Sequence, residues 1–498
     1  MDERGYPVAE AAADLAGARL LAGALIAAGG HWRPWSAAGG QPLPGAFRGA
    51  SLDSRRIRPD ELFVALPGER VDGRRFAAAA LAAGAACVLA GAAGGADGTA
   101  GPGTDEDPLA AAAAPREGAV ILLATDARAA LTTLAARWRA ALPVAVAAVT
   151  GTNGKTTTKD LLAAILAAAG PTHATAGNLN NTLGLPLTLL GLTSAHRFAV
   201  LELGASAEGD IARLAPAAAP RIGVITNASP AHLAEFGSLE GIVRGKGELL
   251  DTLPTDGTAV LNADSHGFAA WAARARCRLA THGETGGDTR WRWRPAAEPG
   301  RGLLELGGRT WEVPLPGRHN GANLAAALLA ARALGVDDRT AAAGLARFAP
   351  SPHRGHLERI GGALVLDDCY NANPASVLSA VAALISLPGD GRALAVLGVM
   401  AELGNDSARL HRQTGEQLAA AGLHGLLAVG AGAEGLAEGF TAEAPGRGLW
   451  VAAKSEAARW LAEQARPGDR VLVKGSRSAG MEDVLAAWRR SATDSAGV

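Results

Sequence analysis

The segment 146–165, VAAVTGTNGKTTTKDLLAAI, combines residue types that bind phosphate. An apolar run ends at Thr150, glycines stand at positions 151 and 154, and Lys155 and Thr156 begin a stretch typical of a helix. Glycines let backbone N–H groups turn toward an anion, and a helix N-terminus adds partial positive charge. A lysine here reaches the outer phosphates of a nucleotide, and a threonine hydroxyl binds Mg²⁺. The expected nucleotide contacts are Gly151, Thr152, Asn153, Gly154, Lys155, Thr156 and Thr157.

The loop departs from the general GxxxxGK(S/T) spacing, because Val149 stands where the first glycine belongs. A glycine-rich strand-to-helix turn without a ligand is the alternative interpretation. The loop by itself also does not distinguish a kinase, a GTPase and a ligase.

The pattern of strands and helices expected around this loop predicts an α/β protein of three domains. We expect a small N-terminal α/β domain over 1–125, a central P-loop-type parallel-sheet ATPase domain over 126–350, and a C-terminal Rossmann-like domain over 351–498. Apolar runs that alternate with helical stretches favour parallel sheets covered on both faces. The expected strands are 62–66, 119–124, 144–150, 198–203, 222–227, 258–263, 363–368, 393–398, 425–430 and 470–475.

Other segments have different patterns. The Ala-rich stretch 75–91 is expected to be helical, and 91–118, rich in Gly, Ala, Pro and Asp, is expected to be a flexible surface insertion. Residues 290–315 favour β-structure, and 321–348 favour a pair of helices.

Composition limits the partners and the compartment. Hydrophobic residues make up 48% of the 498, enough for sizeable cores, and a net charge of -1 gives no reason to expect nucleic acid or an anionic membrane. Cys87, Cys277 and Cys369 are odd in number and far apart, which argues against a disulfide framework or a cysteine zinc site. No secretory signal or membrane-spanning run is recognised, so a cytoplasmic protein without membrane insertion is expected.

Successive segments resemble one protein family in order. They begin with 50–76 and TGTNGKTTTKD (150–160), and continue with AGNLNNTLGLPLTLL (176–190), LELGASAEGDI (201–211), TNASPAHLAEFGSLEGIVRGKGELL (226–250), LPGRHNGANLAAALLA (315–330), DDCYNANPASVLSAV (367–381), LGVMAELGNDSARLHRQTGE (397–416) and VLVKGSRSAGMEDVL (471–485). The chain resembles the Mur ligases, above all the branch that adds D-alanyl-D-alanine. Only 91–118 and the last few residues lie outside the resemblance.

The resemblance implies an ADP-forming amide ligase of peptidoglycan precursor synthesis. ATP would phosphorylate a carboxylate of UDP-N-acetylmuramoyl-tripeptide, and the amine of D-alanyl-D-alanine would attack the acyl phosphate. Charge collects on phosphate oxygens in such a reaction, so positioned cations carry much of the catalysis. A monomer is expected.

The resemblance also implies two Mg²⁺ ions, held by Thr156, Glu202, His232 and Lys246, the last as a lysine carbamylated by CO₂. Carbamylation needs a neutral amine, so the pKa of Lys246 should be lowered. The alternatives are a surface acid at Glu202, a loop histidine at His232 and a solvated helical lysine at Lys246.

Further residues would contact ATP by resemblance. Asn320 and Asn323 of HNGAN would bind the nucleotide, although Asn320 could instead cap a helix. Arg354 would meet the γ-phosphate from a hinge between domains, and Asp368 would meet the ribose hydroxyls. The implied catalytic residues are Lys155, Lys246, His232 and Arg354.

The substrate-binding residues divide between the two ends of the chain. Hydroxyls and a guanidinium in the first domain suit a UDP-sugar, amides in GNLNN suit the muropeptide, and a cation in KGSRS suits the dipeptide carboxylate. Polar turns without ligands remain the alternative for each. The candidates are Ser51, Ser54, Arg55, Asp72, Gly73, Asn178, Asn180, Asn181, Tyr370, Asn371, Asn373, Lys474, Ser476 and Arg477.

One position departs from the family pattern, since Val399 stands where an Asp is usual. Two other interpretations are open: another ligase of the superfamily, such as a folylpolyglutamate synthase or a different Mur ligase, and a non-catalytic nucleotide-binding protein with a degenerate site. GNLNN, YNANP and the absence of a DNPR-like motif disfavour the first, and the complete set of metal and phosphate residues disfavours the second.

Overall fold

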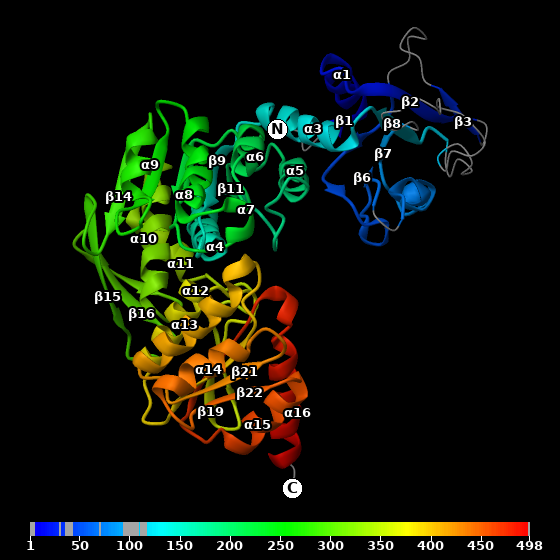
Figure 1. The fold of residues 1–498 in the computed structure, drawn as a ribbon. Helices are drawn as coiled ribbons and strands as arrows, with labels where there is room; N and C mark the ends of the chain where they lie inside the picture. The colour runs from blue at the N-terminus through cyan, green and yellow to red at the C-terminus, as the bar shows by residue number, and fades with distance from the viewer. Residues whose placement is uncertain are drawn as a thin grey trace. The chain divides into compact units, whose positions relative to one another are not determined.

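The computed structural model describes residues 5–28, 31–34, 43–68, 71–92, 109 and 117–496. The chain divides into two compact units (Figure 1). The first comprises Met1–Ala148, Gly170–Gly204 and Ala212–Arg221. The second comprises Val149–Ala169, Ala205–Ile211 and Ile222–Val498. No helix in the described ranges is both long and apolar enough to cross a membrane.

The first unit contains a six-stranded sheet in the order β3-β2-β8-β7-β6-β5. Strands β5 to β8 are parallel, whereas β2 runs antiparallel to β8 and β3. Phe63, Leu81, Val88 and Ile121 are among the residues of its buried core. The strands are β2 Leu21–Ala28, β3 His31–Pro34, β5 Ala50–Ser51, β6 Leu62–Ala65, β7 Cys87–Gly91 and β8 Val120–Ala124, and the helices nearby are α1 Val8–Gly17, α2 Ala77–Ala82 and α3 Ala127–Ala140.

The prediction of a helix over 75–91 was wrong for most of its length. Helix α2 ends at Ala82, Gly84 takes φ +110, and β7 follows. The residues Cys87 to Ala90 are fully buried between β6 and β8, and this burial overrides the helical propensity of the alanines. The predicted insertion, 91–118, lies almost entirely outside the described residues.

Ring stacking and a hydrogen bond of Trp138 hold α3 in place within the first unit. The ring of Trp138 stacks on Tyr6 with centroids 5.0 Å apart, and its Nε1 donates to the carbonyl of Leu192 at 2.9 Å. This unit also holds strands in the order β10-β11-β9, with β10 and β11 parallel. Their bounds are β10 Thr172–Ala174, β11 Phe198–Glu202 and β9 Ala145–Thr150, with α5 Gly184–Leu190 and α6 Asp210–Ala218; a short pair, β1 Tyr6–Pro7 and β4 Ala46–Phe47, completes the strands.

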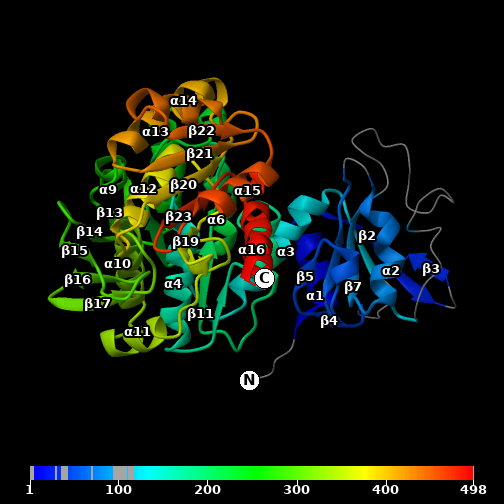
Figure 2. The same cartoon turned by 90° about the horizontal axis from the view of Figure 1, so that it is seen from below.

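The second unit begins with strands in the order β12-β13-β14-β15-β16-β17. The first four are parallel, and β15 to β17 form an antiparallel meander, as the β-rich pattern of 290–315 predicted. Helix α10 packs along these strands and against α4 (Figure 2). The elements are β12 Ile222–Ile225, β13 Thr258–Asn262, β14 Arg278–Gly283, β15 Thr289–Pro295, β16 Gly302–Leu306, β17 Arg309–Val313, α4 Lys155–Ala167, α7 Leu233–Phe236, α8 Leu239–Gly247, α9 Phe268–Arg274, α10 Arg318–Ala333 and α11 Asp338–Leu345.

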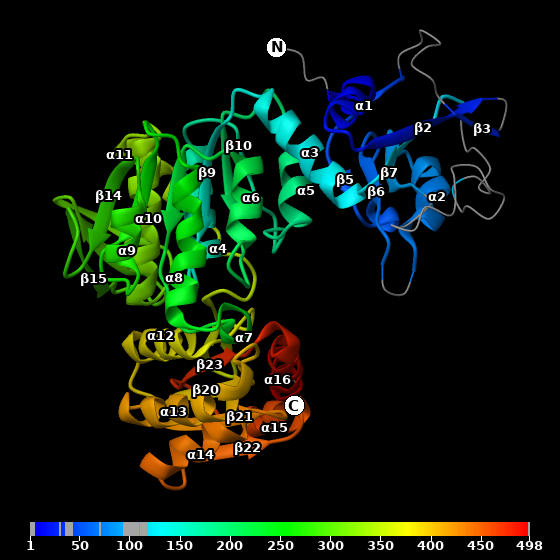
Figure 3. The same cartoon turned by 45° about the horizontal axis from the view of Figure 1, so that its top comes forward.

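A second sheet of this unit has the order β18-β19-β23-β20-β21-β22, parallel except for β18. Helices α12, α13 and α14 bury one face, and α15 and α16 bury the other (Figure 3). The elements are β18 His356–Ile360, β19 Ala363–Asp367, β20 Ala393–Gly398, β21 Gly425–Val429, β22 Gly448–Val451, β23 Arg470–Lys474, α12 Pro374–Ser386, α13 Ser407–Ala420, α14 Glu434–Glu443, α15 Lys454–Gln464 and α16 Glu482–Ala496.

The α/β class and the Rossmann-like C-terminal sheet are confirmed, whereas the predicted domain borders stay a prediction. The two edge strands of this sheet, β18 and β22, were missed. Both are short and partly exposed, and β18 lacks an apolar run. Since carboxyl ends of parallel strands meet at one edge, the segments after β19, β20 and β23 are brought together. These segments carry the YNANP, VMAELG and KGSRS motifs.

Replacing Leu472 in the central strand β23 by alanine should destabilise the C-terminal sheet. Leu472 is fully buried, so we expect a loss of about 2–5 kcal/mol in the free energy of unfolding. Leu449→Ala on β22 is the control, because that side chain is 48% exposed and should cost about 0.5 kcal/mol or less. Hydrogen exchange of β20 and β23 amides in urea measures both. Equal effects of the two substitutions would contradict the assignment of this core.

Candidate functional site

The phosphate loop is a strand-to-helix turn with no room for side chains at its glycines. Gly151 has φ +139, and a Cβ there would lie 2.0 Å from Oγ1 of Thr226. Gly154 has φ +80, and its Cβ would lie 2.2 Å from Oδ1 of Asn323. Helix α4 begins directly afterwards at Lys155. The loop therefore presents backbone N–H groups at a helix N-terminus, the arrangement that binds phosphate.

A second segment, 226–229, follows β12 directly and is hydrogen-bonded to this loop. The Thr226 hydroxyl donates to the Asn153 carbonyl at 2.6 Å. Asn227 accepts from the Asn153 N–H at 3.1 Å and donates to its carbonyl at 3.0 Å. Ser229 Oγ accepts from the Asn153 side chain at 3.0 Å. Sequence reasoning missed these residues, although their position after a buried strand in TNAS was an available signal.

Lys155 folds back over the loop. Its Nζ donates to the carbonyls of Gly151 and Thr152, both at 2.9 Å. These two hydrogen bonds hold the amine against the loop. Thr156 is buried in the first turn of α4.

The two asparagines of HNGAN are buried and bonded to each other. Asn323 Nδ2 donates to Oδ1 of Asn320 at 3.0 Å, and Asn320 Nδ2 donates to the Pro316 carbonyl at 2.8 Å. Asn320 does not cap the helix, because α10 begins at Arg318 with Gly317 as its cap. Asn323 instead faces Gly154, so this pair supports the phosphate loop from α10.

Lys246 lies buried in α8, with 2% of its surface exposed. Its Nζ donates to the Ala205 carbonyl at 2.9 Å and sits 5.1 Å from the centroid of the Phe236 ring. Burial lowers the pKa of this amine to about 7, and the positive charge of Lys155 acts in the same direction. The alternative of a solvated helical lysine is therefore wrong.

His232 occupies a strained position before α7, with φ +50. Its Nδ1 lies 2.9 Å from Oε2 of Glu402. Burial lowers the pKa of the imidazole, the charges of Lys246 and Lys155 add to that effect, and Glu402 opposes it. His232, Lys246 and Lys155 therefore belong to one electrostatic neighbourhood.

The donors of this neighbourhood suit Mg²⁺ that arrives with a nucleotide. No group of three or more His, Cys, Asp or Glu side chains gathers within the described residues. Mg²⁺ commonly keeps several waters and binds through one or two protein ligands plus substrate phosphates. A few protein ligands of that kind would come from His232, Thr156 and a carbamate on Lys246.

The segment after α11 is tied to both halves of the second unit. Ser351 Oγ donates to Oδ2 of Asp160 in α4 at 2.6 Å. His353, at φ +60, contacts Oδ2 of Asp367 through Nδ1 at 2.8 Å. The guanidinium of Arg354 lies over the ring of Tyr370, 3.9 Å from its centroid. Arg354 is thus held on the YNANP segment of the C-terminal sheet.

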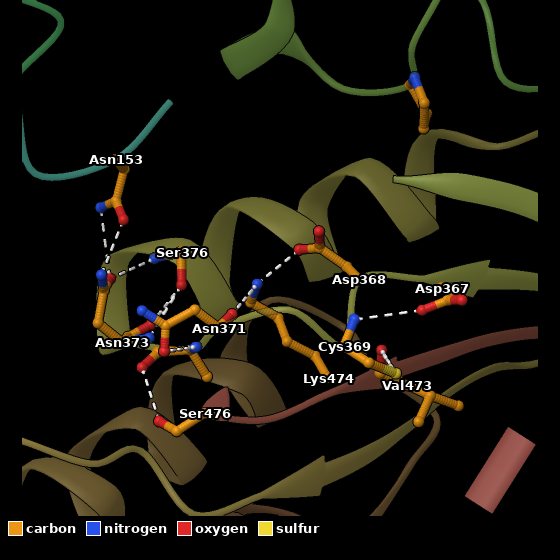
Figure 4. Close-up of polar contacts among 12 residues, drawn as sticks. Asn153, Asp367, Asp368, Cys369, Asn371, Asn373, Ser376, Val473, Lys474 and Ser476 are labelled. Carbon is orange, nitrogen blue, oxygen red and sulfur yellow. Dashed lines mark hydrogen bonds and ion pairs between the residues drawn. The ribbon is translucent and has the colours of Figure 1, made fainter. Parts of the chain in front are cut away.

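Lys474 and Asp368 form a buried ion pair beneath the YNANP segment (Figure 4). The Lys474 Nζ lies 2.5 Å from Oδ2 of Asp368 and donates to the Asn371 carbonyl at 2.7 Å. Its side chain is only 4% exposed. Arg477, the other cation of KGSRS, is 60% exposed and pairs with Glu482 at 2.7 Å.

Asn373 links the C-terminal sheet to the phosphate loop. It caps α12 by accepting from the Ser376 N–H, and its side-chain amide exchanges hydrogen bonds of 2.7 and 3.3 Å with that of Asn153 (Figure 4). Ser476 is buried between two loops, where Oγ donates to the Ala372 carbonyl at 3.2 Å and accepts from the Ala401 N–H at 2.7 Å.

Val399, the residue that departs from the family pattern, forms a hydrogen bond through its backbone. Its carbonyl accepts from the Ser476 N–H at 3.0 Å, so the turn after β20 keeps its tie to KGSRS. Glu402, three residues on, is a site residue that sequence reasoning missed.

In the first unit, Glu202 and Asn180 are brought together. Glu202 is buried at the end of β11, and its Oε1 accepts from Nδ2 of Asn180 at 2.7 Å. The surface-acid alternative for Glu202 is therefore wrong. Asn181 accepts from the N–H groups of Leu183 and Gly184 and so starts α5, while the Asn178 carbonyl accepts from the Asn180 N–H.

The UDP-sugar candidates form two short polar turns. Ser51 and Asp53 bond each other, and Asp53 caps the turn that starts at Ser54. Arg55 pairs with Asp53 through two bonds of 2.9 Å, which lower the pKa of that carboxyl to about 2.

The second turn is built around Asp72. Asp72 caps the turn that begins at Gly73 and pairs with Arg74. A Cβ at Gly73 would lie 2.6 Å from the Leu66 carbonyl, so only glycine fits there.

A parallel-sheet protein with this phosphate loop, a buried lysine of lowered pKa and a histidine in the same electrostatic neighbourhood belongs to the P-loop-type nucleotide-binding enzymes. Three family descriptions match the chain: "Mur ligase family, catalytic domain" at 47–139, "Mur ligase middle domain" at 149–331 and "Mur ligase, glutamate ligase domain" at 353–477. The chain belongs to the Mur ligase family.

Two similar proteins are both named UDP-N-acetylmuramoyl-tripeptide--D-alanyl-D-alanine ligase. The relative from Escherichia coli is 36% identical over 91% of this chain and 97% of its own length. The relative from Mycobacterium tuberculosis is 37% identical over 86% and 90%.

Solved structures agree with these relatives. A crystal structure of MurF from Acinetobacter baumannii has a TM-score of 0.76 at 32% identity and covers 89% of this chain and 93% of its own. The structure of MurF ligase from Thermotoga maritima in complex with ADP has a TM-score of 0.74 at 28% identity and covers 90% and 98%.

Alanine at Gly154 should abolish nucleotide binding. The added Cβ would meet the buried, hydrogen-bonded amide of Asn323, so the loop must open, and we expect at least about a 100-fold weaker affinity for ATP, or about 2.7 kcal/mol. Gly422→Ala is the matched control: its φ is +87 but nothing lies near its Cβ, so it carries only the conformational cost of about 1–2 kcal/mol in stability. Isothermal titration compares the two, and unchanged ATP affinity in Gly154→Ala would rule out this loop.

Proposed function

We propose that the chain is an ATP-dependent, ADP-forming ligase that joins D-alanyl-D-alanine to UDP-N-acetylmuramoyl-tripeptide. The observation that carries the proposal is the phosphate loop, locked by Thr226, Asn227 and Asn323, in a chain that aligns with ligases of that name over nearly its whole length. An ADP complex of a structural neighbour supports the nucleotide.

The first step is phosphoryl transfer to the tripeptide. A carboxylate oxygen attacks the γ-phosphorus of ATP, the bond from phosphorus to the β–γ bridging oxygen breaks, and ADP leaves. The backbone N–H groups of 151–156 and the Lys155 amine hold the phosphates and stabilise the charge that spreads over their oxygens. Mg²⁺, when bound, supplies further neutralisation of the β- and γ-oxygens.

His232, Thr156 and Lys246, all of the second unit, are the residues that we assign to Mg²⁺, and a role for Glu202 stays a prediction from the family resemblance. The pKa of about 7 leaves much of the Lys246 amine neutral near physiological pH, as carbamylation by CO₂ requires. The Asn180 amide orients the Glu202 carboxylate through the bond to Oε1.

The second step forms the amide. The dipeptide amine attacks the acyl carbon, the carbon–nitrogen bond forms, the amine loses a proton, and the carbon–oxygen bond to phosphate breaks. The YNANP segment supports Arg354 through Tyr370 and contacts the phosphate loop through Asn373, so the same segment serves both substrates. Exclusion of water here protects the acyl phosphate.

Arg477 is the better candidate for the dipeptide carboxylate. Lys474 is buried against Asp368, whereas Arg477 is exposed, although it pairs with Glu482, and has a planar group that binds carboxylates through two bonds. Asp368 keeps Oδ1 for the ribose hydroxyls assigned to it. The proposed setting is the cytoplasm, and the proposed state is a monomer.

The alternatives are not favoured. The folylpolyglutamate synthase among the structural neighbours is 18% identical with a TM-score of 0.57, a likeness of fold alone. A degenerate binding protein would not need to keep a buried lysine and a buried carboxylate.

The purified protein should release ADP and phosphate only when ATP, UDP-N-acetylmuramoyl-tripeptide and D-alanyl-D-alanine are all present. Lys155→Ala should reduce turnover by at least about 1,000-fold, since it removes the cation that meets the transferred phosphoryl group. Lys454→Ala, on α15, is the control and should leave the rate unchanged. Coupled ADP release measures all three proteins. Release of AMP, or a requirement for folate and glutamate, would reject the proposal.

Carbamylation of Lys246 should depend on pH around 7. The folded pKa lies below that of a free lysine, so the amine loses its proton as pH rises through 7, and only then reacts with CO₂. With ¹³CO₂ at fixed concentration, the carbamate signal in ¹³C NMR should grow from pH 6 to pH 8 and be missing in Lys246→Arg. Lys246→Ala should be partly rescued by short carboxylates. A signal of equal size in Lys246→Arg would show that another amine reacts.

A further inference from the structure

Glu402 and His232 face each other across two loops of the second unit. Nδ1 of His232 lies 2.9 Å from Oε2 of Glu402. His232 precedes α7 and has φ +50, and Glu402 follows β20 and has φ +62. Both residues thus adopt the left-handed backbone conformation, which residues other than glycine rarely adopt. Two facing residues with this conformation indicate that the surrounding structure holds them there.

The loop that carries Glu402 is fixed from three sides. His411, fully buried in α13, accepts from the Met400 N–H through Nε2 at 2.9 Å. Ser476 accepts from the Ala401 N–H at 2.7 Å. On the far side of Glu402, the turn Gly404–Asp406 packs against α7, with Gly404 beside Ala234. The carboxylate therefore reaches His232 from a preformed position.

The stability of the ion pair does not explain this arrangement. The Glu402 side chain is 56% exposed, and exposed pairs contribute little to stability. The pair does determine which imidazole nitrogen carries a hydrogen. A carboxylate at Nδ1 accepts its N–H and leaves the lone pair of Nε2 free, the arrangement found in metal-binding histidines.

We propose that Glu402 is a positioning residue that fixes the ring and tautomer of His232 so that Nε2 can bind Mg²⁺. Because Glu402 belongs to the C-terminal sheet and His232 to the other sheet of the unit, the affinity for this ion depends on the contact between the loop 399–403 and α7. The inference rests on the proposed role of His232 as a metal ligand. It assigns the second residue of AELG, Glu402, to the ATP end of the reaction and not to the dipeptide.

The test uses the full-length protein with a non-hydrolysable ATP analogue and Mn²⁺, whose binding is followed by electron paramagnetic resonance. Glu402→Ala should weaken the His232-dependent ion by about 10- to 100-fold, as loss of such partners usually does. Glu402→Gln should weaken it less, because its amide oxygen still accepts from Nδ1. Glu443→Ala is the control, since Glu443 is an exposed acid at the end of α14 in the same sheet domain. It should match the unsubstituted protein.

A second measurement reports the tautomer without metal or turnover. In ¹⁵N-histidine NMR, assigned with His232→Gln, the unsubstituted protein should have hydrogen on Nδ1, and Glu402→Ala should move it largely to Nε2. The inference is overturned if Glu402→Ala leaves both Mn²⁺ affinity and tautomer unchanged in protein of unchanged melting temperature. It is also overturned if Glu443→Ala produces the same losses. Failure of the proposed function differs, since the unsubstituted protein would then lack dipeptide-dependent ADP release.

Discussion

The structure depends on the lack of space around two glycines. Gly151 touches Thr226, and Gly154 touches Asn323, so the phosphate loop is enclosed by the end of β12 on one side and α10 on the other. Each neighbour is itself hydrogen-bonded, Thr226 to the loop carbonyls and Asn323 to Asn320. Backbone N–H groups held in this way need no reorganisation when phosphate binds, which is the condition for strong electrostatic stabilisation.

Polar contacts connect this loop to the C-terminal sheet. Asn153 exchanges amide hydrogen bonds with Asn373, Ser351 bonds Asp160 on the helix of the phosphate loop, and Glu402 meets His232. These contacts are exposed or half-buried and individually weak, so they can break and re-form at little cost. A contact of that strength suits an enzyme that must admit one substrate after another and still exclude water during transfer.

The cations near the loop have different environments and therefore different chemistry. Lys155 donates to two carbonyls of its own loop, which holds its amine at the phosphate loop. Lys246 is buried, and its pKa of about 7 leaves much of its amine neutral near physiological pH. Lys474 is buried and forms an ion pair with Asp368 beneath the YNANP segment. Burial and hydrogen-bond partners thus differ among the three lysines, although all three are the same residue type.

The sequence by itself determined the phosphate loop, the α/β class, most central strands and the family, because these follow from local spacing and from long apolar runs. It failed where burial competes with propensity, as in the alanine-rich stretch 75–91 that becomes partly β7. Only the tertiary structure revealed the hydrogen bonds of 226–229 to the phosphate loop, the pair of Glu402 with His232, and the ion pair of Lys474 with Asp368. These join residues from tens to about 170 positions apart, and no local pattern encodes which side chains meet when the carboxyl ends of separate strands converge.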